Sequence, residues 1–507
     1  MTAAGGKTMN KLRKLPALLT AAVCAAAFSG SVTAAAASGG ILSGDLNGDG
    51  SPGTEDIRIL TDHLTTQKPL TDRQQAAAAD LDGDGRLTAA DLTCLKRMVL
   101  TQSVPDPDAL LKRPLDALSP TMPAVGKVRV LLLAVSFPDC AHEPALTDEQ
   151  ITAQCFGPAD SESLSYPMES ISAYYQRASY NRLTIEGDAF QYTAKDAIGS
   201  YAGYADKLTN EIFAALDDTV DFSRYDFDRD GVMDAVIIAV PGNADKTAWH
   251  PHTNLFPGRQ TYDGVRIGSR SIGRGSLKER AAFNSTWAHE LGHAMGLPDY
   301  YKYENQTDGY YGLNGDAGWE LMDDAGGDLS AFSKLMLGWY AESEIQIYRG
   351  GTQSFRLESA QNVPSLLLIP RGELNGFLSE YFILEYQTAA GNNHAFFSGL
   401  SIYKPFQEGG LRILHCDATV CQGVRAPELK WNNYGKYYDK SNGKQRILRL
   451  ADEAEGGTFF RTGETVTGSV SGFRWYDDSG GQTVDPGLKV TVSSISDGIC
   501  SVTVSQS

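Results

Sequence analysis

Residues 288–301 read AHELGHAMGLPDYY, and this stretch decides how most of the chain is interpreted. His289 and His293 lie four residues apart, so on a helix both imidazoles project from the same face, one turn from each other. Glu290, next to the first histidine, can reach a water molecule on a metal ion without becoming a ligand itself. The pattern predicts a two-pronged metal clamp with Glu290 as the general base.

The residues that follow predict a third ligand. Gly296 favours the left-handed conformation that ends a helix, and Pro298 cannot continue the helix. The chain must then turn back, which brings the carboxylate of Asp299 toward the same ion. Three protein ligands and a fourth position for water form the catalytic type of zinc site. The alternative, an ordinary amphipathic helix with two core histidines, leaves Gly296, Asp299 and the later Met322 unaccounted for.

The motifs around this helix resemble a known family. HELGHAMGLPDYY, followed by GWELMDDAGG and LGW, is similar to the M6 or immune inhibitor A-like family of secreted zinc metallopeptidases. The resemblance implies a mixed α/β, metzincin-like peptidase domain that binds one zinc ion. It gives roles to five residues: His289, His293 and Asp299 as zinc ligands, Glu290 as the base, and Met322 as the methionine beneath the site.

Composition and charge narrow the classes of function. The chain has 507 residues, 42% of them hydrophobic, which suits two to four globular domains. Its formal net charge of -18 argues against nucleic acid or an anionic membrane as a partner, because both attract a basic surface. Residues 9–37 have the basic start, apolar run and small residues of a secretory signal. The apolar run is shorter than the roughly 20 residues of a membrane span, so we expect export without a membrane anchor.

An acidic pattern then occurs twice, as DLNGDGSPGTED from Asp45 and DLDGDGRLTAAD from Asp80. Each copy has oxygen-bearing side chains at positions 1, 3 and 5, glycine at 6 and an acid at 12, which is typical of a calcium loop. Helix-like stretches follow at 57–64 and 92–100. The predicted calcium ligands are Asp45, Asn47, Asp49 and Asp56 in the first loop, and Asp80, Asp82, Asp84 and Asp91 in the second.

Two such loops in register, each followed by one helix, resemble the dockerin module. The resemblance implies a domain that folds on two calcium ions and binds a cohesin domain on a scaffoldin, as in cellulosome-type assemblies. The protein would then be secreted, and held at a cell surface wherever the scaffoldin is attached there. Loop positions 10 and 11 would face the cohesin; these are Thr54 and Glu55, and Ala89 and Ala90.

The rest of the chain divides by composition. A proline-rich stretch predicts a linker, alternating strands and helices predict a mixed α/β domain, and short alternating runs near the C-terminus predict a β-rich region. We therefore expect a multidomain protein. Its parts are a signal region (1–37), a small α-helical dockerin (38–100), a linker (101–126), a zinc peptidase domain (127–350) and a β-rich C-terminal region (351–507).

A third acidic loop stands before the apolar strand predicted at 235–240. Its calcium-loop spacing predicts one more calcium site, and a plain turn rich in aspartate and glycine is the alternative. The candidate ligands are Asp226, Asp228, Asp230 and Asp234. The zinc motif also has four nearby tyrosines that could supply a phenol to stabilise an oxyanion, and the sequence does not choose among Tyr300, Tyr301, Tyr310 and Tyr311.

The leading hypothesis is a secreted zinc endopeptidase acting on a protein or peptide substrate. A zinc-activated water would attack the peptide bond while Glu290 takes its proton and returns it to the leaving amine. Two alternatives stay open. Dockerins usually deliver carbohydrate-active enzymes, so the chain could be one of these in the same assembly. It could also be a peptidase-like binding protein without activity, which the intact base and histidines disfavour.

Overall fold

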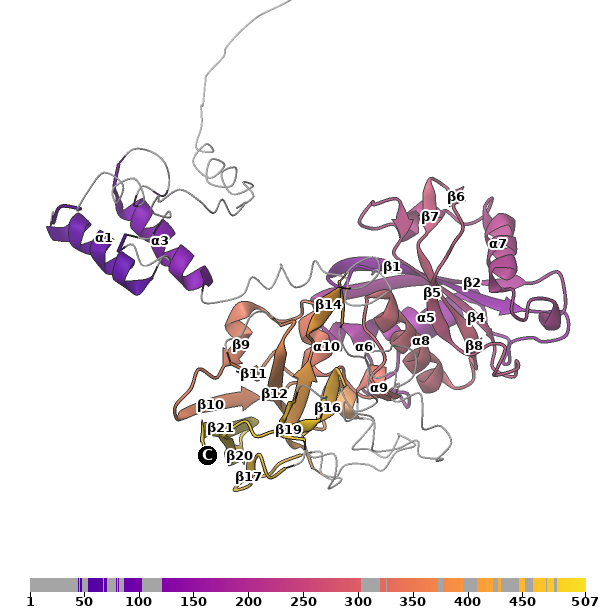
Figure 1. The fold of residues 1–507 in the computed structure, drawn as a ribbon. Coiled ribbons are helices and arrows are strands. Elements are labelled where there is room, and N and C mark those ends of the chain that lie inside the picture. The colour runs from indigo at the N-terminus through magenta and orange to yellow at the C-terminus, as the bar shows by residue number, and fades with distance from the viewer. Residues whose placement is uncertain are drawn as a thin grey trace, which may run out of the picture. The chain divides into compact units, whose positions relative to one another are not determined.

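The computed structural model describes residues 44, 46–47, 53–66, 68–70, 79, 81, 86–102, 121–301, 320–324, 326–372, 377–394, 408–422, 427–429, 446–451, 459–470, 472–477 and 481–507. These residues belong to two compact units, Met1–Ser103 and Val104–Ser507, each of which is described by itself. Figure 1 shows the helices and strands of both. Within the described ranges, no helix is both long and apolar enough to cross a lipid bilayer.

The first unit contains helices α1 (Thr54–Thr66) and α3 (Ala89–Gln102), which include both helix-like stretches predicted from the sequence. The helices contact each other around a small apolar core. Its buried members are Leu46, Leu60, Ala79 and Leu95.

The last acid of each predicted calcium loop is buried and holds its own loop by the same hydrogen bonds. Asp56 Oδ1 accepts from the amide of Leu46 at 2.7 Å, and its Oδ2 accepts from Gly53 at 2.6 Å. In the second loop, Asp91 Oδ1 accepts from Leu81 at 2.8 Å and Oδ2 accepts from the amide of Thr88 at 2.7 Å. The sequence repeat is therefore also a structural repeat in the described residues.

The second unit is built on a five-stranded sheet in the order β2-β1-β4-β8-β5. The first four strands are parallel, and the edge strand β5 is antiparallel to β8. Their bounds are β1 Gly126–Ser136, β2 Leu183–Thr193, β4 Ala235–Pro241, β5 His252–Leu255 and β8 Ser269–Gly275. A central strand with both faces covered should be apolar, and residues 130–135 of β1, which read VLLLAV and are all buried, fit that rule.

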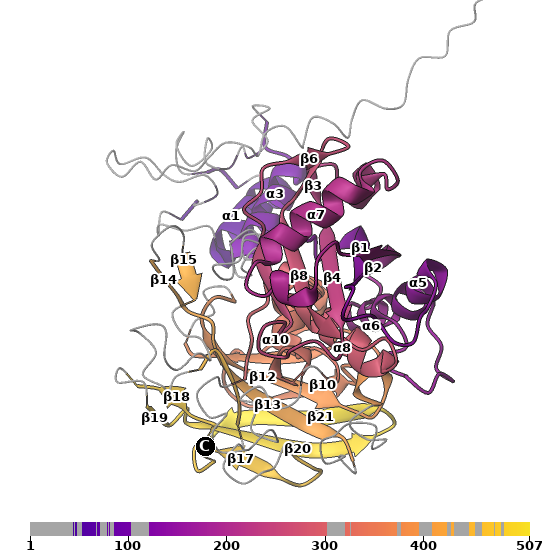
Figure 2. The same ribbon diagram turned by 90° about the vertical axis from the view of Figure 1, so that its right-hand side faces the viewer.

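Helices cover both faces of this sheet (Figure 2). Val130 and Leu132 of β1 belong to one core with α5 (Asp148–Phe156), α6 (Ile171–Ala178) and α8 (Arg280–Ala294). Leu131 and Leu133 alternate to the opposite core, which includes α7 (Ala205–Leu216). The mixed α/β arrangement predicted for this region is thus present.

The shorter elements of the same region include helices that follow the metal motif. The strands are β3 (Val232–Met233), β6 (Thr261–Tyr262) and β7 (Val265–Ile267), and the helices are α9 (Leu321–Asp324) and α10 (Ala331–Met336). Single 3-10 turns lie at Ile198–Ser200, Phe222–Tyr225, Glu342–Glu344 and Gly391–Asn393.

The C-terminal region contains two larger sheets, in the orders β16-β13-β12-β11-β9 and β10-β21-β20-β17, which pack on each other through an apolar core. Strands β9 to β13 are Ile345–Ile347, Gln353–Glu358, Leu366–Pro370, Glu380–Gln387 and Gly410–Asp417. The other strands are β14 (Val420–Gln422), β15 (Pro427–Leu429), β16 (Leu448–Leu450), β17 (Thr465–Thr467), β18 (Trp475–Tyr476), β19 (Gln482–Val484), β20 (Leu488–Ser496) and β21 (Ile499–Gln506).

The proposed boundary at residue 350 runs inside this compact unit. Strand β9 lies before the boundary and pairs in parallel with β11, which lies after it. The five-stranded C-terminal sheet also contributes Leu366 and Ile383 to the core that contains α8. The β-rich region is therefore continuous with the α/β region that precedes it.

Candidate metal centre

Helix α8 carries the HExxH motif and is fixed in the core by its apolar side chains, among them Trp287 and Leu291. It ends in a Schellman motif, in which the amide of Gly296 donates to the carbonyl of His293 at 2.9 Å and that of Leu297 to Gly292 at 3.0 Å. Gly296 has a φ of 98°, which L-residues rarely adopt. The predicted helix stop is present, and it returns the chain toward the histidines.

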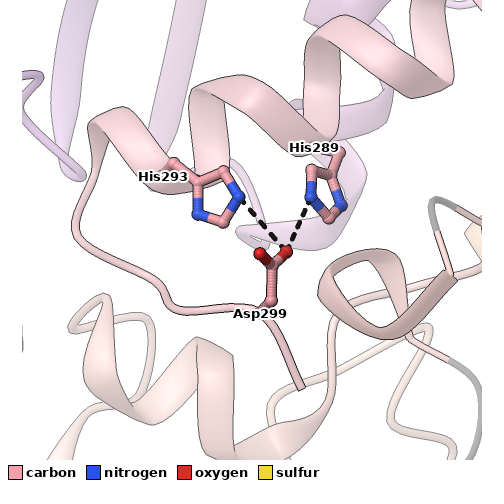
Figure 3. Close-up of side chains that lie close together, drawn as sticks. All are labelled: His289, His293 and Asp299. Atoms are coloured by element: carbon pink, nitrogen blue, oxygen red, sulfur yellow. Dashed lines mark ion pairs between the residues drawn. The ribbon is translucent and has the colours of Figure 1, made fainter. Parts of the chain in front are cut away.

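The three predicted zinc ligands converge at one point (Figure 3). Asp299 Oδ1 lies 3.0 Å from His289 Nε2 and 3.2 Å from His293 Nε2. The other ring nitrogens are held by backbone carbonyls: His289 Nδ1 donates to Leu321 and His293 Nδ1 to Leu297, both at 2.8 Å. Because a carbonyl only accepts, the neutral rings carry their proton on Nδ1 and leave the Nε2 lone pairs for a metal ion.

The electrostatics of the three side chains also suit a cation. Burial favours the neutral imidazole, but contacts with Asp299 outweigh it, raising the pKa of His289 and raising that of His293 to about 9. Although burial opposes ionisation, the two imidazoles hold the pKa of Asp299 well below its usual range. The site therefore contains a buried carboxylate that needs a positive neighbour. Two imidazole nitrogens and one carboxylate oxygen form a donor set that fits zinc.

Glu290 lies beside the ligands, almost fully buried, and its carboxylate is held by the edge strand β5. The hydroxyl of Thr253 lies 2.9 Å from Glu290 Oε2 and 2.8 Å from Ser271 Oγ on the neighbouring strand. Sequence reasoning missed Thr253, because β5 is only four residues long and carries no recognisable pattern.

Met322 lies against helix α8 at Gly292. It is fully buried, and a Cβ added at Gly292 would lie 2.5 Å from its sulfur. Only glycine lets the methionine approach the helix this closely. The amide of Tyr300 donates to the carbonyl of Met322 at 3.0 Å, which ties the segment after Asp299 to this floor.

The structure narrows the choice among the four tyrosines. Tyr300 is fully buried, and its hydroxyl contacts Ser333 Oγ at 3.1 Å, so its phenol belongs to the core. Tyr301 is partly exposed, and its ring centroid lies 6.4 Å from that of His289. Tyr310 and Tyr311 lie outside the described residues.

The third acidic loop also brings carboxylates together. Ligand atoms of Asp226, Asp228 and Asp234 lie within 4.8 Å of one another. Asp230 is not in this group, and its carboxylate accepts from the amide of Val232 at 2.7 Å. Burial is the main cause that raises the pKa of Asp234, to about 6. The group could hold a cation or form a plain turn.

The dockerin-like unit is described only in part. Asn47, Asp56 and Asp91 lie in it, whereas five predicted ligands, Asp45, Asp49, Asp80, Asp82 and Asp84, lie outside the described residues. Of the predicted partner-facing residues, Thr54, Glu55 and Ala89 are exposed, and the side chain of Ala90 lies outside the description. Glu55 forms an ion pair with Arg58 on the same helix.

Two segments of the chain match known protein families. Residues 43–100 match the dockerin type I domain, and residues 252–320, which include the histidine motif, match peptidase M66. The predicted combination of a dockerin and a peptidase is confirmed, and the peptidase family that matches is M66, whereas the sequence motifs resembled M6. Residues 43–100 are thus similar to a type I dockerin domain, and residues 252–320 to a segment of peptidase M66.

No curated protein matches the chain, but several solved structures show weak similarity. Wild-type OgpA from Akkermansia muciniphila is 16% identical, with 55% of this chain and 75% of that chain covered and a TM-score of 0.24. Inactive OgpA in complex with an O-glycopeptide (glycodrosocin) substrate is 15% identical, with 56% and 75% covered and a TM-score of 0.21. These TM-scores are too low to support an argument about fold or substrate.

Proposed function

We propose that the chain is a secreted zinc-dependent endopeptidase that its dockerin attaches to a cohesin-bearing scaffoldin. The observation that carries the catalytic part is the convergence of His289 Nε2, His293 Nε2 and Asp299 Oδ1. Glu290 stands next to this cluster on the same helix, and the residues that match peptidase M66 include the motif. A metzincin-like organisation, with Met322 as the floor of the site, agrees with this geometry.

A zinc ion bound by the three ligands would polarise the scissile carbonyl and make water a better nucleophile. Glu290 accepts a proton from the attacking water and donates it to the leaving amine. The hydroxyl of Thr253 contacts both Oε2 and the backbone carbonyl of Glu290, at 2.9 and 2.8 Å, and so helps to position that residue. Tyr301 is the described tyrosine best placed to stabilise the oxyanion, because its ring lies beside His289 at the partly exposed side of the site.

Metal removal tests this proposal directly. The full chain should cleave an unfolded, fluorescently labelled protein, lose this activity on dialysis against a chelator, and regain it with one equivalent of zinc. Near-complete loss is expected because the ligands alone supply no Lewis acid. A folded, zinc-loaded chain that cut no member of a broad peptide panel would favour the binding-protein alternative. Release of sugars from a polysaccharide without peptide cleavage would favour the carbohydrate-active alternative.

For the dockerin we propose two calcium ions and a cohesin partner bound through the exposed faces at Thr54–Glu55 and Ala89–Ala90. The equivalent hydrogen bonds of Asp56 and Asp91 support two equivalent loops. Because the two partner-facing pairs differ in sequence, the two faces should not be interchangeable. No nucleic-acid or membrane partner is proposed, since the chain is strongly acidic.

We also propose a third calcium ion at Asp226, Asp228 and Asp234, with Asp230 on the rim. Calcium at 100 times its Kd should stabilise the unit by about 2.7 kcal/mol, and Asp228→Asn should remove more than half of this gain. All six tryptophans lie after residue 103, so tryptophan fluorescence during melting reports this unit without the dockerin. Asp218→Asn, an exposed change of equal charge, is the control. Equal calcium-induced shifts in both variants would leave the plain turn as the explanation.

A further inference from the structure

Glu320 is a fully buried carboxylate in the segment GWELMDD, and the mechanism above gives it no role. Its Oε1 accepts from the amide of Met322 at 2.9 Å. Its Oε2 accepts from the amide of Ser330 at 2.8 Å and from the hydroxyl of Ser333 at 2.7 Å. These donors are two backbone amides and one hydroxyl. Burying a carboxylate costs free energy even when it is hydrogen-bonded, so this position calls for an explanation.

The first connection runs from Glu320 to a zinc ligand. The carbonyl of Leu321 accepts from His289 Nδ1 at 2.8 Å and so sets the orientation of that ring. Leu321 lies between Glu320 and Met322, which are joined by the hydrogen bond to Oε1. The amide of Asp323 also donates to the carbonyl of Glu320 at 3.1 Å. The turn that presents the Leu321 carbonyl is therefore held on both sides.

A second connection runs from Glu320 to the segment that carries Asp299. The hydroxyl of Ser333, which contacts Glu320, also contacts the hydroxyl of Tyr300 at 3.1 Å. Tyr300 directly follows Asp299, and its amide donates to the carbonyl of Met322 at 3.0 Å. Side chain and backbone of Tyr300 are thus fixed to the same turn that orients His289.

We propose that Glu320 is a positioning residue of the metal centre, which fixes the carbonyl behind His289 and, through Ser333 and Tyr300, the backbone beside Asp299. The inference rests on the proposed function, because it assigns Glu320 to the zinc site. Partners in the second layer around a metal orient its ligands, and their loss typically lowers metal affinity about 10–100-fold. An amide in place of the carboxylate cannot accept on both sides, so Glu320→Gln must give up one set of donors.

The test is zinc affinity, measured by competition with a chelator on the full chain and on Glu320→Gln. We expect the variant to bind zinc about 10–100-fold more weakly. We also expect the visible spectrum of its cobalt-substituted form to change, because that spectrum reports ligand geometry. The matched control is Glu380→Gln. Glu380 is also a buried carboxylate that accepts from a backbone amide (Tyr476, 2.8 Å) and a side chain (His415, 2.9 Å), but in the C-terminal sheet.

Glu380→Gln should keep the parent zinc affinity and cobalt spectrum even where it lowers the melting temperature. If the parent binds zinc and Glu320→Gln binds it within twofold of the parent affinity, the role of Glu320 is refuted and the proposed function stands. If the parent binds no zinc, both the role of Glu320 and the proposed function are refuted. If Glu320→Gln failed to fold, Ser333→Ala decides. It removes the hydroxyl that contacts both the Glu320 carboxylate and the Tyr300 hydroxyl, and we expect about threefold to tenfold weaker zinc binding. An unchanged affinity in Ser333→Ala would then refute the inference.

Discussion

Replacing Glu290 by glutamine should lower kcat about 10²–10⁴-fold while the protein stays folded and keeps its zinc. The amide has nearly the shape of the carboxylate, and its oxygen can still accept from Thr253, which lies 2.9 Å from Oε2 in the parent. It cannot take up a proton at neutral pH, so only the general-base step is removed. KM should change little, because the substitution leaves the ligands and the edge strand in place.

Steady-state cleavage of a peptide by parent and variant at equal zinc content measures this effect. Glu279→Gln is the matched control, since it makes the same chemical change at the exposed start of helix α8, where Glu279 makes no side-chain capping bond. It should leave kcat unchanged. Activity of Glu290→Gln within tenfold of the parent would show that another group serves as the base. Loss of zinc in the variant would mean that Glu290 is needed for binding rather than for proton transfer.

The sequence was enough to predict the metal cluster, because its three residues lie close together in the chain. His289 and His293 share one helical face, and Gly296 with Pro298 forces the return that brings Asp299 back. Every step of that inference depends on neighbours in sequence. The observed convergence of the three side chains follows the same short-range logic.

The groups that hold the cluster were not predictable in the same way. Thr253 reaches Glu290 across 37 residues, through an edge strand too short to show a pattern. Glu320 lies inside a quoted motif, but its role depends on Ser330 and Ser333, which only the tertiary fold brings to its carboxylate. Sequence patterns report propensity and periodicity, and they carry no information about such pairings.

The fold was predictable to a similar extent. The apolar run of β1 and the alternating C-terminal strands predicted the correct type of structure, because both follow from burial on one face or two. The sequence did not show that the C-terminal sheets pack against the α/β region. All eight residues of strand β12, EYFILEYQ, are buried, so the sheet is covered on both faces. The sequence of the strand does not say which elements cover it. In the structure, one face packs on the second C-terminal sheet and the other joins the core that includes α8 and α10.

Ending the chain at residue 350 should therefore abolish folding of the metal centre rather than remove an accessory domain. All six residues of α10 are buried, and the C-terminal sheet contributes Leu368, Ile383 and Leu414 to the core that contains this helix. Leaving several apolar groups of this size exposed costs about 1.5–3 kcal/mol each. A handful of them approaches the whole stability of a domain, about 5–15 kcal/mol.

Polar contacts across the same boundary would be broken as well. Glu385 Oε2 accepts from the amide of Ala331 at the start of α10, and the amide of Asp328 donates to Asn393 Oδ1 at 3.0 Å. Asp328 in turn forms a buried ion pair with Lys334 at 2.7 Å. Without their partners, these groups would exchange hydrogen bonds within the protein for hydrogen bonds to water, which costs about 0.5–1.5 kcal/mol for each bond.

Near-UV circular dichroism, tryptophan fluorescence during melting and zinc titration of a chain ending at residue 350 measure the outcome. We expect no cooperative transition and no stoichiometric zinc binding. Deletion of residues 1–103 is the control, because that cut follows the division between the two compact units and should preserve both properties. A shortened chain that melted cooperatively and bound one zinc ion would show that the α/β region stabilises its own site. The C-terminal sheets would then need another role, whereas loss of folding would make them the support on which α10 and the turn at Met322 are held.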